Sequence, residues 1–203
     1  MLWCVIAGKE KGHPLSKKAV FVKEFLPYII MLVIVLLIRI VLLINATIPT
    51  ESMENTIPRK TRVMGLKSSY WFQEPARGDI VVFDAPDEPG TPYVKRVIGI
   101  PGDTVEVTGG HVFVNGTELT EPYLKEEMRE YAYTPGDEDF GPETVPEDCY
   151  FCMGDNRNAS WDARFWDNTW VTKDAIVGKV YFCYWPRPSW IDGTDGDTFD
   201  VFS

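Results

Sequence analysis

Ser52 and Lys95 are the two residues of this chain whose types and surroundings could perform nucleophilic chemistry. Ser52 lies in the segment 48–57, directly after a long apolar run. A serine hydroxyl is a poor nucleophile at its ordinary pKa and needs a neighbouring base. Only two histidines are present, His13 and His111. Lys95 is the better base, because it interrupts an apolar strand pattern and burial there would favour its neutral form. The two residues would form a Ser-Lys dyad.

Four segments around these residues resemble the conserved boxes of the type I signal peptidases, in the single-anchor bacterial form. The boxes are 49–56, 77–83, 93–103 and 154–164, and they occur in family order after an apolar anchor. The resemblance covers most of residues 28–185. It implies a membrane-bound serine endopeptidase that removes N-terminal signal peptides from secreted preproteins, with Ser52 as nucleophile and Lys95 as general base. The family pattern implies no cofactor and no metal.

The resemblance also assigns supporting roles around the dyad. Thr50 would join the Ser52 backbone N–H in an oxyanion hole, and Ser160 would orient the Lys95 amine through a hydrogen bond. Structural support is expected from Arg96, Asp155, Asp162 and Arg164, with Asp155 as the partner of Arg96. The chain departs from the common pattern at Asn55, where many members have proline, and this change concerns the rigidity of the turn more than the chemistry.

Substrate is expected to bind as an added strand, because main-chain pairing accepts many sequences while pockets test alternate side chains. By resemblance, the flanking residues are Ile48, Tyr93 and Val94. Their surroundings would form small pockets that admit alanine-like residues at positions −1 and −3 of a preprotein. The expected partners are therefore secretory preproteins and the lipid bilayer, with the secretion machinery nearby.

Each assignment has a structural alternative. Ser52 could cap a short helical turn, since Glu54 and Asn55 follow it. Lys95 could be a strand lysine that reaches solvent. Adjacent strand residues face opposite ways, so one of Lys95 and Arg96 points inward if the strand is half buried, and the resemblance makes Lys95 the inward one.

Other functions fit the sequence less well. A self-cleaving repressor-type protease would have a DNA-binding region in place of the membrane anchor. A penicillin-recognising enzyme would need Ser-x-x-Lys, which the chain lacks. A Ser-His hydrolase would have to use His111, beside a predicted hairpin turn. The remaining alternative is an inactive, membrane-anchored homologue that acts as a binding protein, although such a role requires none of Ser52, Lys95 and Ser160.

The charge distribution predicts one membrane anchor and its orientation. Residues 1–24 carry a net charge of +3, whereas residues 45–203 carry −14. Fourteen of the 17 residues in 28–44 are Ile, Leu or Val, and their insertion free energy of roughly −6 kcal/mol outweighs the roughly +3.5 kcal/mol cost of Arg39. We therefore predict a cytoplasmic tail over 1–24, a transmembrane signal-anchor helix over 25–47 and an extracytoplasmic catalytic domain over 48–203. The acidic domain also argues against nucleic-acid binding.

The domain after the anchor is predicted to be mainly antiparallel β, because short β-rich runs alternate with turns. The expected strands are 61–67, 79–84, 93–100, 104–108, 111–115, 149–153 and 177–184. Residues 121–147, rich in acids, prolines and glycines, are predicted to be a surface insertion. Cys149 and Cys152 have CxxC spacing, but positions i and i+3 of a strand face opposite ways, so packing is favoured over a disulfide or a metal site.

Overall fold

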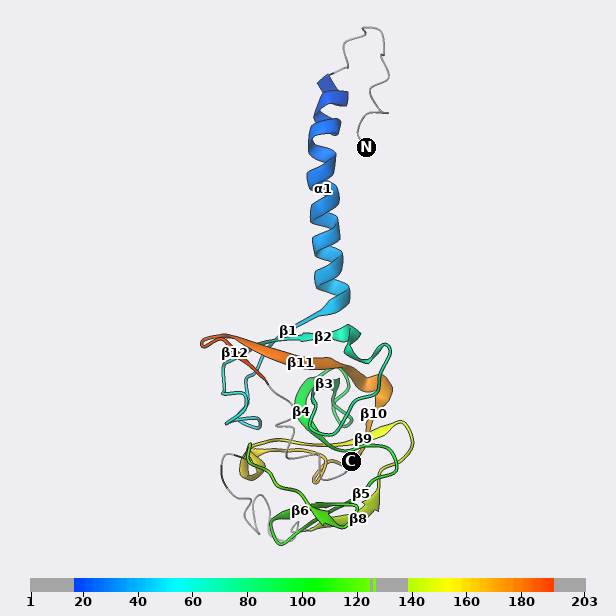
Figure 1. Ribbon diagram of the computed structural model, residues 1–203, viewed down its shortest axis with the longest axis vertical. Coiled ribbons are helices and arrows are strands. Elements are labelled where there is room, and N and C mark those ends of the chain that lie inside the picture. The colour runs from blue at the N-terminus through cyan, green and yellow to red at the C-terminus, as the bar shows by residue number, and fades with distance from the viewer. Residues whose placement is uncertain (1–16, 125, 127–138, 192–203) are drawn as a thin grey trace, which may run out of the picture. The chain divides into compact units, whose positions relative to one another are not determined.

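The computed structural model describes residues 17–124, 126 and 139–191, with side chains described from residue 21. The predicted cytoplasmic tail therefore lies largely outside the described residues, as do His13, Cys4 and the middle of the predicted insertion. By internal contacts the chain divides into two compact units, residues 1–40 and 41–203. The first contains most of helix α1 and the second contains every strand (Figure 1).

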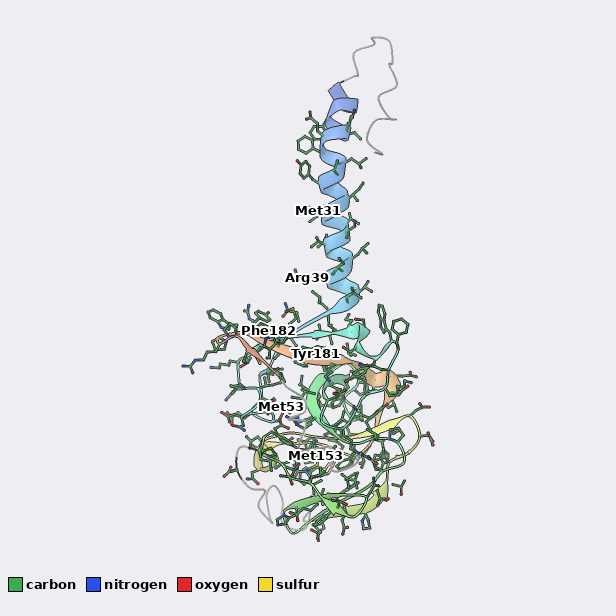
Figure 2. The ribbon with its side chains drawn as sticks, in the orientation of Figure 1. Met31, Arg39, Met53, Met153, Tyr181 and Phe182 are labelled. Carbon is green, nitrogen blue, oxygen red and sulfur yellow. The ribbon has the colours of Figure 1, made fainter. Side chains whose placement is uncertain are left out.

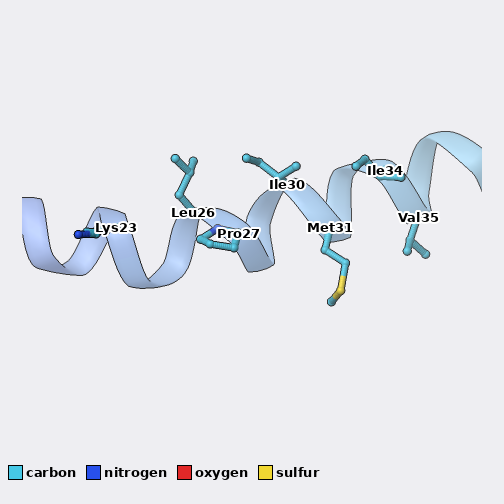
Figure 3. Close-up of a pocket in the computed structure, with 7 residues that line it drawn as sticks. All are labelled: Lys23, Leu26, Pro27, Ile30, Met31, Ile34 and Val35. Carbon is cyan, nitrogen blue, oxygen red and sulfur yellow. The ribbon is translucent and has the colours of Figure 1, made fainter. Parts of the chain in front are cut away.

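Helix α1, Lys17–Leu42, is the one helix of the described residues that is long and apolar enough to cross a membrane, over the 22 residues Phe21–Leu42. Its apolar side chains are exposed all round, as expected for a lipid-facing helix. Figure 3 shows Lys23, Pro27 and Met31 along a shallow depression to which this helix alone contributes. The depression is therefore an open helix surface rather than an enclosed binding cavity.

The helix ends five residues earlier than the predicted span, because β1, Leu43–Thr47, pairs antiparallel with β2, Arg62–Leu66. Ile44 lies opposite Gly65 in this pair, and its side chain is buried in the core of the second unit. Asn45, opposite Met64, receives a hydrogen bond from Tyr184 Oη at 2.8 Å. The end of the apolar run therefore belongs to the β domain.

The larger sheet has eight strands and all its pairings are antiparallel. Its order is β1-β2-β11-β3-β4-β9-β10, and β12 pairs with β11. The remaining members are β3 (Ile80–Asp84), β4 (Pro92–Gly99), β9 (Cys149–Met153), β10 (Val171–Thr172), β11 (Ile176–Trp185) and β12 (Ser189–Trp190). Three short 3₁₀ helices, η1 (Lys67–Tyr70), η2 (Arg157–Ala159) and η3 (Lys173–Ala175), connect the strands.

A smaller sheet has the order β7-β6-β5-β8 and lies beyond β9 from β1 and β2 in Figure 1. Its strands are β5 (Thr104–Thr108), β6 (His111–Val114), β7 (Thr117–Glu118) and β8 (Phe140–Thr144). Alternate valines of β5 and β6 are buried, and Gly109 and Gly110 make the turn between them with φ of 56° and 84°. Positive φ at both positions is the geometry of a tight hairpin turn.

The core of the β domain lies on both faces of β3. Val81 and Phe83 belong to one apolar cluster, and Ile80 and Val82 to another on the opposite face. A strand covered on both faces has no polar face, which explains the continuous apolar run Ile80–Phe83.

The mainly antiparallel β fold predicted from the sequence is confirmed, and each of the seven predicted strands is present within two residues of its expected ends. Five further strands, β1, β7, β8, β10 and β12, were not predicted. Three of them, β7, β10 and β12, have only two residues each, and β8 lacks alternating burial. The sequences of these four strands therefore carry little strand pattern.

The segment 121–147, predicted to be a surface insertion, contacts the β domain at both of its described ends. At its end, β8 pairs with β5, and the side chain of Val145 is buried in the core. At its start, Glu121 forms an ion pair with the buried Arg157. The composition of the segment concealed these contacts, because they use backbone hydrogen bonds and a single charge rather than a run of apolar residues.

Candidate active site

Ser52 lies in a compact turn between β1 and β2. Met53 and Ile57 anchor this turn, since both side chains are fully buried and the Ile57 N–H donates to the Met53 carbonyl at 2.7 Å. Figure 2 labels Met53, next to Ser52, and Met153, next to Gly154, in the interior of the β domain. The Ser52 residue itself is 8 % exposed, so its hydroxyl is held at the edge of the core.

Thr50, predicted as an oxyanion-hole donor, lies beside the serine. Its Oγ1 atom is 3.3 Å from Ser52 Oγ, and either hydroxyl can donate in this pair. A hydroxyl in this position can turn toward an oxygen that develops negative charge next to Ser52 Oγ.

Lys95 lies in the middle of β4, opposite Val81 of β3. The expectation that only one of Lys95 and Arg96 points inward is wrong, since Lys95 is 3 % exposed and Arg96 2 %. The reason is that β4 lies between β3 and β9 with both faces covered, so the premise of a half-buried strand does not hold. Both cations are buried, on opposite faces of one strand.

The Lys95 amine donates a hydrogen bond to Ser160 Oγ at 2.9 Å. Burial lowers the pKa of Lys95 to about 8, against the opposing effect of Asp162 and with a further lowering by Arg164. A neutral lysine amine has a lone pair that can accept a proton, and the Ser160 contact restricts its orientation. This arrangement supplies a base within the range of neutral to mildly alkaline pH.

Asp162 and Arg164 form a buried ion pair next to this lysine. Arg164 Nε donates to Asp162 Oδ1 at 2.8 Å, and the Gly154 N–H donates to Asp162 Oδ2 at 3.0 Å. Burial acts to raise the pKa of the Asp162 carboxyl, but Arg164, Lys95 and the backbone bond together hold it at about 2. The carboxylate therefore stays charged and bonded, and it fixes the Gly154 backbone.

Gly154 is the point at which the Ser52 turn and Ser160, the hydrogen-bond partner of Lys95, meet. A Cβ atom at this position would lie 2.3 Å from Ser160 Oγ and 2.5 Å from the Ser52 carbonyl oxygen. Neither distance is possible for a real side chain, so only glycine allows both neighbours to approach. Ser52 and Ser160, the hydrogen-bond partner of Lys95, therefore lie against the same backbone atoms.

Arg96 and Asp155 form the ion pair expected between them. Two parallel bonds of 2.8 Å join Arg96 Nε to Asp155 Oδ1 and Arg96 Nη2 to Oδ2. Arg96 also donates to the Gly78 carbonyl at 3.0 Å, and Thr56 Oγ1 donates to Asp155 Oδ2. The pair therefore ties β4 to the end of the Ser52 turn.

The three residues expected to flank substrate pack against two different apolar clusters of the β domain. Ile48 is buried, and its backbone bonds Thr61 and Lys60 at 2.9 and 2.8 Å. Val94 and Ala46 are partly buried against one apolar cluster. Tyr93 packs instead on the opposite cluster, with its ring centroid 6.1 Å from that of Trp166.

Asn156 is a functional candidate that the sequence reasoning missed. Its backbone N–H donates to the Ser52 carbonyl at 3.0 Å, and its side-chain amide donates to the Glu51 carbonyl at 3.0 Å. Asn156 is the third residue of the Gly154–Arg164 box, which was expected to frame the dyad. Its position in this box was the feature of the sequence that could have identified it. Its two hydrogen bonds hold the backbone at the nucleophile.

His111, the base required by a Ser-His hydrolase, is the only histidine of the described residues. It belongs to β6 of the smaller sheet, and its Nδ1 atom lies 2.7 Å from Glu118 Oε1 at the surface. The described contacts of Ser52 involve no imidazole.

Ser52, Lys95 and Ser160 form a candidate hydrolase site within an antiparallel β domain. Comparison with known proteins places the chain among peptidases: a family described as "Signal peptidase, peptidase S26" matches residues 22–185. The chain belongs to this signal peptidase family. One of its relatives is a signal peptidase I of Bacillus amyloliquefaciens, 37% identical over 88% of this chain and 95% of that protein.

Cyanobacterial relatives are also similar. Signal peptidase I of Leptolyngbya laminosa is 42% identical over 68% of this chain, and the probable signal peptidase I-2 of Synechocystis is 38% identical over 70%. The matches cover 67% and 62% of these two proteins, about two thirds of their length. A solved structure of a signal peptidase I from Enterococcus faecalis is 32% identical, with a TM-score of 0.43, and covers 53% of this chain and 97% of that one.

Proposed function

We propose that this chain is a membrane-anchored signal peptidase that cuts signal peptides from secreted preproteins with a Ser52–Lys95 dyad. The observation that carries the proposal is the buried Lys95 amine, with its pKa lowered to about 8 and a hydrogen bond to Ser160. Ser160 lies against Gly154, the glycine that the Ser52 carbonyl also approaches. Membership of the signal peptidase family supports the same reaction class.

In the proposed reaction, Ser52 Oγ attacks the carbonyl carbon of the scissile peptide bond and its proton passes to the neutral Lys95 amine. Negative charge develops on the carbonyl oxygen, where the Ser52 backbone N–H and the Thr50 hydroxyl stabilise it. The Lys95 ammonium then gives its proton to the leaving amine, which releases the mature protein. Water hydrolyses the remaining ester to Ser52, with Lys95 again accepting a proton.

The substrate chain is proposed to pair with the first half of β4. Residues Pro92–Lys95 pair with β3 on one side, whereas pairing with β9 begins only at Arg96. Along the other edge of 92–95, the described residues supply no strand partner. An extended peptide at such an edge gains main-chain hydrogen bonds and places alternate side chains toward Val94 and Ala46.

The anchor is proposed to be α1, with the N-terminus in the cytoplasm and the β domain outside. A net charge of +3 over the first 24 residues and −14 over 45–203 supports this orientation. Signal peptides are themselves apolar segments that enter the membrane, so an anchored enzyme meets them at the surface where they emerge.

The test uses the purified full chain in detergent and a preprotein with alanine at −1 and −3. Cleavage should occur at the signal-peptide junction, and Ser52→Ala should abolish it. The matched control is His111→Ala, which removes an exposed side chain of the smaller sheet and should leave the rate unchanged. Binding of several preproteins without any cleavage would instead identify a membrane-anchored binding protein.

A further inference from the structure

Asn55 adopts a backbone conformation that a proline could not adopt. Its φ is +94°, in the left-handed half of the φ range. Proline is restricted to a φ near −65°, whereas asparagine is among the non-glycine residues that tolerate positive φ. The backbone of the Ser52 turn is therefore not restricted by a proline ring at this position.

The side chain of Asn55 supplies a tether to a distant segment. Its Nδ2 atom donates to the Tyr123 carbonyl at 2.7 Å and lies 3.4 Å from the Leu124 carbonyl. Asn55 is exposed, so it fills no space in the core. Its interaction with the segment Glu121–Leu124, called the strap below, is therefore a specific connection rather than general packing.

The strap is itself fixed to residues that surround the candidate site. Glu121 accepts two bonds, of 3.0 and 2.5 Å, from the Arg157 guanidinium, whose Nε donates to the Gly154 carbonyl at 2.9 Å. The Arg157 side chain is 0 % exposed and that of Glu121 9 %. A buried ion pair with this geometry resists separation, because either partner alone would be an uncompensated buried charge.

A second anchor of the strap is the ring of Tyr123. The Arg96 guanidinium lies over this ring, 3.9 Å from its centroid, and the same guanidinium forms the bidentate pair with Asp155. The strap thus rests on the ion pair of β4 and on the arginine that holds Gly154. Asn55 joins the serine turn to this fixed support.

We propose that Asn55 is a positioning residue for Ser52, acting through its hydrogen bond to the strap. The inference deepens the proposed function and rests on it. Nucleophilic attack needs reacting atoms about 3 Å apart and aligned, and a small displacement of the serine turn lowers the rate of the chemical step more than it affects substrate binding. The tether limits that displacement at Asn55, three residues after Ser52.

The test compares kcat and KM of substitutions at Asn55 with a preprotein that has alanine at −1. Asn55→Gly keeps the backbone conformation but removes the amide donor, and it should lower kcat about tenfold with KM within about twofold. Asn55→Pro excludes the observed φ and should lower kcat about a hundredfold. The midpoint of the pH–rate profile should not move in Asn55→Gly, because Asn55 is not among the groups that shift the Lys95 pKa.

Asn115→Gly is the matched control. Asn115 also has a positive φ, of 53°, and its side chain bonds Thr104 and Asp103 in the smaller sheet. The control should lower the melting temperature but keep the kcat of the unmodified chain. A wild-type kcat in Asn55→Gly, or an equal loss of kcat in Asn115→Gly, would overturn the positioning role.

A second substitution, at Glu121, weakens the other end of the strap. It tests the positioning role even if Asn55→Gly does not fold. Glu121→Gln keeps the shape of the side chain but weakens its bonds to Arg157, and it should lower kcat about threefold. In Asn55→Gly/Glu121→Gln the loss should be smaller than the product of the single losses, because both changes release the same segment. A wild-type kcat in folded Glu121→Gln, or multiplicative losses, would count against the strap.

The two proposals fail in different ways. If the unmodified chain cuts no preprotein, the proposed function is wrong. If it cuts preproteins and Asn55→Gly has the same kcat, only the positioning role of Asn55 is wrong.

Discussion

At the scale of single residues, the notable feature is a lysine and an arginine buried side by side in one strand with different protonation behaviour. Arg96 is paired through two hydrogen bonds with Asp155, and its pKa is raised despite the opposing effect of burial. Lys95 has a hydroxyl as its hydrogen-bond partner, and burial lowers its pKa to about 8. Burial can therefore make Lys95 neutral, whereas an arginine stays charged in a protein.

The first prediction separates the basicity of Lys95 from its charge. The rate of cleavage should rise with pH through about 8, because below this pKa the amine is protonated and cannot accept the Ser52 proton. Lys95→Arg should lower kcat at least about a hundredfold at all pH values, since arginine stays charged in proteins. The pH–rate profiles of both proteins, with folding checked by circular dichroism, measure this. Substantial turnover by folded Lys95→Arg would rule out the dyad.

The second prediction concerns Gly154→Ala. The added methyl group would lie 2.5 Å from the Ser52 carbonyl oxygen, a backbone atom that moves only with its loop. We expect the free energy of unfolding to fall by about 1–3 kcal/mol from overpacking, and activity to fall at least about tenfold because Ser52 is displaced. Urea denaturation and cleavage assays measure the two effects.

Gly90→Ala provides the comparison for this prediction. Gly90 has a φ of +88° and open space around its Cβ position, so the substitution strains the backbone without a clash. It should reduce stability but not activity. Equal loss of activity in both variants would show that the contact at Gly154 is not what matters.

At the scale of secondary-structure elements, β4 combines two roles that are usually separate. From Lys95 to Gly99 every residue of the strand is buried, and pairing with β9 begins at Arg96. Its first three residues, Pro92–Val94, are more exposed and pair with β3 alone among the described strands. The same strand thus fixes the base in the core and offers an edge to a peptide.

This arrangement predicts selectivity at position −1 of the substrate. The side chains of Val94 and Ala46 pack on a closed apolar cluster, which leaves little space for a large residue. Replacing alanine by phenylalanine at −1 should lower kcat/KM about a hundredfold or more, because close packing does not absorb the added volume. The comparison uses one preprotein with either residue, cut by the same enzyme preparation. Equal kcat/KM values would show that the pocket is not small.

At the scale of the whole molecule, an apolar helix with exposed side chains is followed by a β domain of opposite charge to the N-terminal segment. The domain begins immediately after the helix, since Leu42 ends α1 and Leu43 begins β1. The nucleophile follows only ten residues after the end of the helix. An extended chain spans at most about 3.3–3.6 Å per residue, so these ten residues limit the distance between Ser52 and the end of the helix.

The topology prediction follows from this order of charges. Protease added outside cells whose wall has been removed should digest the β domain after Ala46 and spare the first 24 residues. Tags at the two ends of the chain, detected before and after digestion and after lysis, measure this. Protection of the β domain in intact cells would reverse the orientation proposed here.

The sequence by itself determined the β class, the apolar helix and the family. Local patterns are sufficient for these, since alternating or continuous apolar runs predict strands and glycine pairs such as Gly109-Gly110 predict turns. Four motifs in order identified the chemistry expected of Ser52 and Lys95. All of these are properties of neighbouring residues in the chain.

Only the tertiary structure decided how the site is enclosed. The burial of both Lys95 and Arg96 depends on both faces of β4 being covered in the folded domain, and the role of the strap depends on Asn55 meeting a segment 68 residues away. Such contacts are made by single charges and backbone carbonyls, which leave no periodic pattern in the sequence. For this reason residues 121–124 resembled a surface insertion by composition, whereas in the folded chain Glu121 binds the buried Arg157 and Tyr123 packs on Arg96.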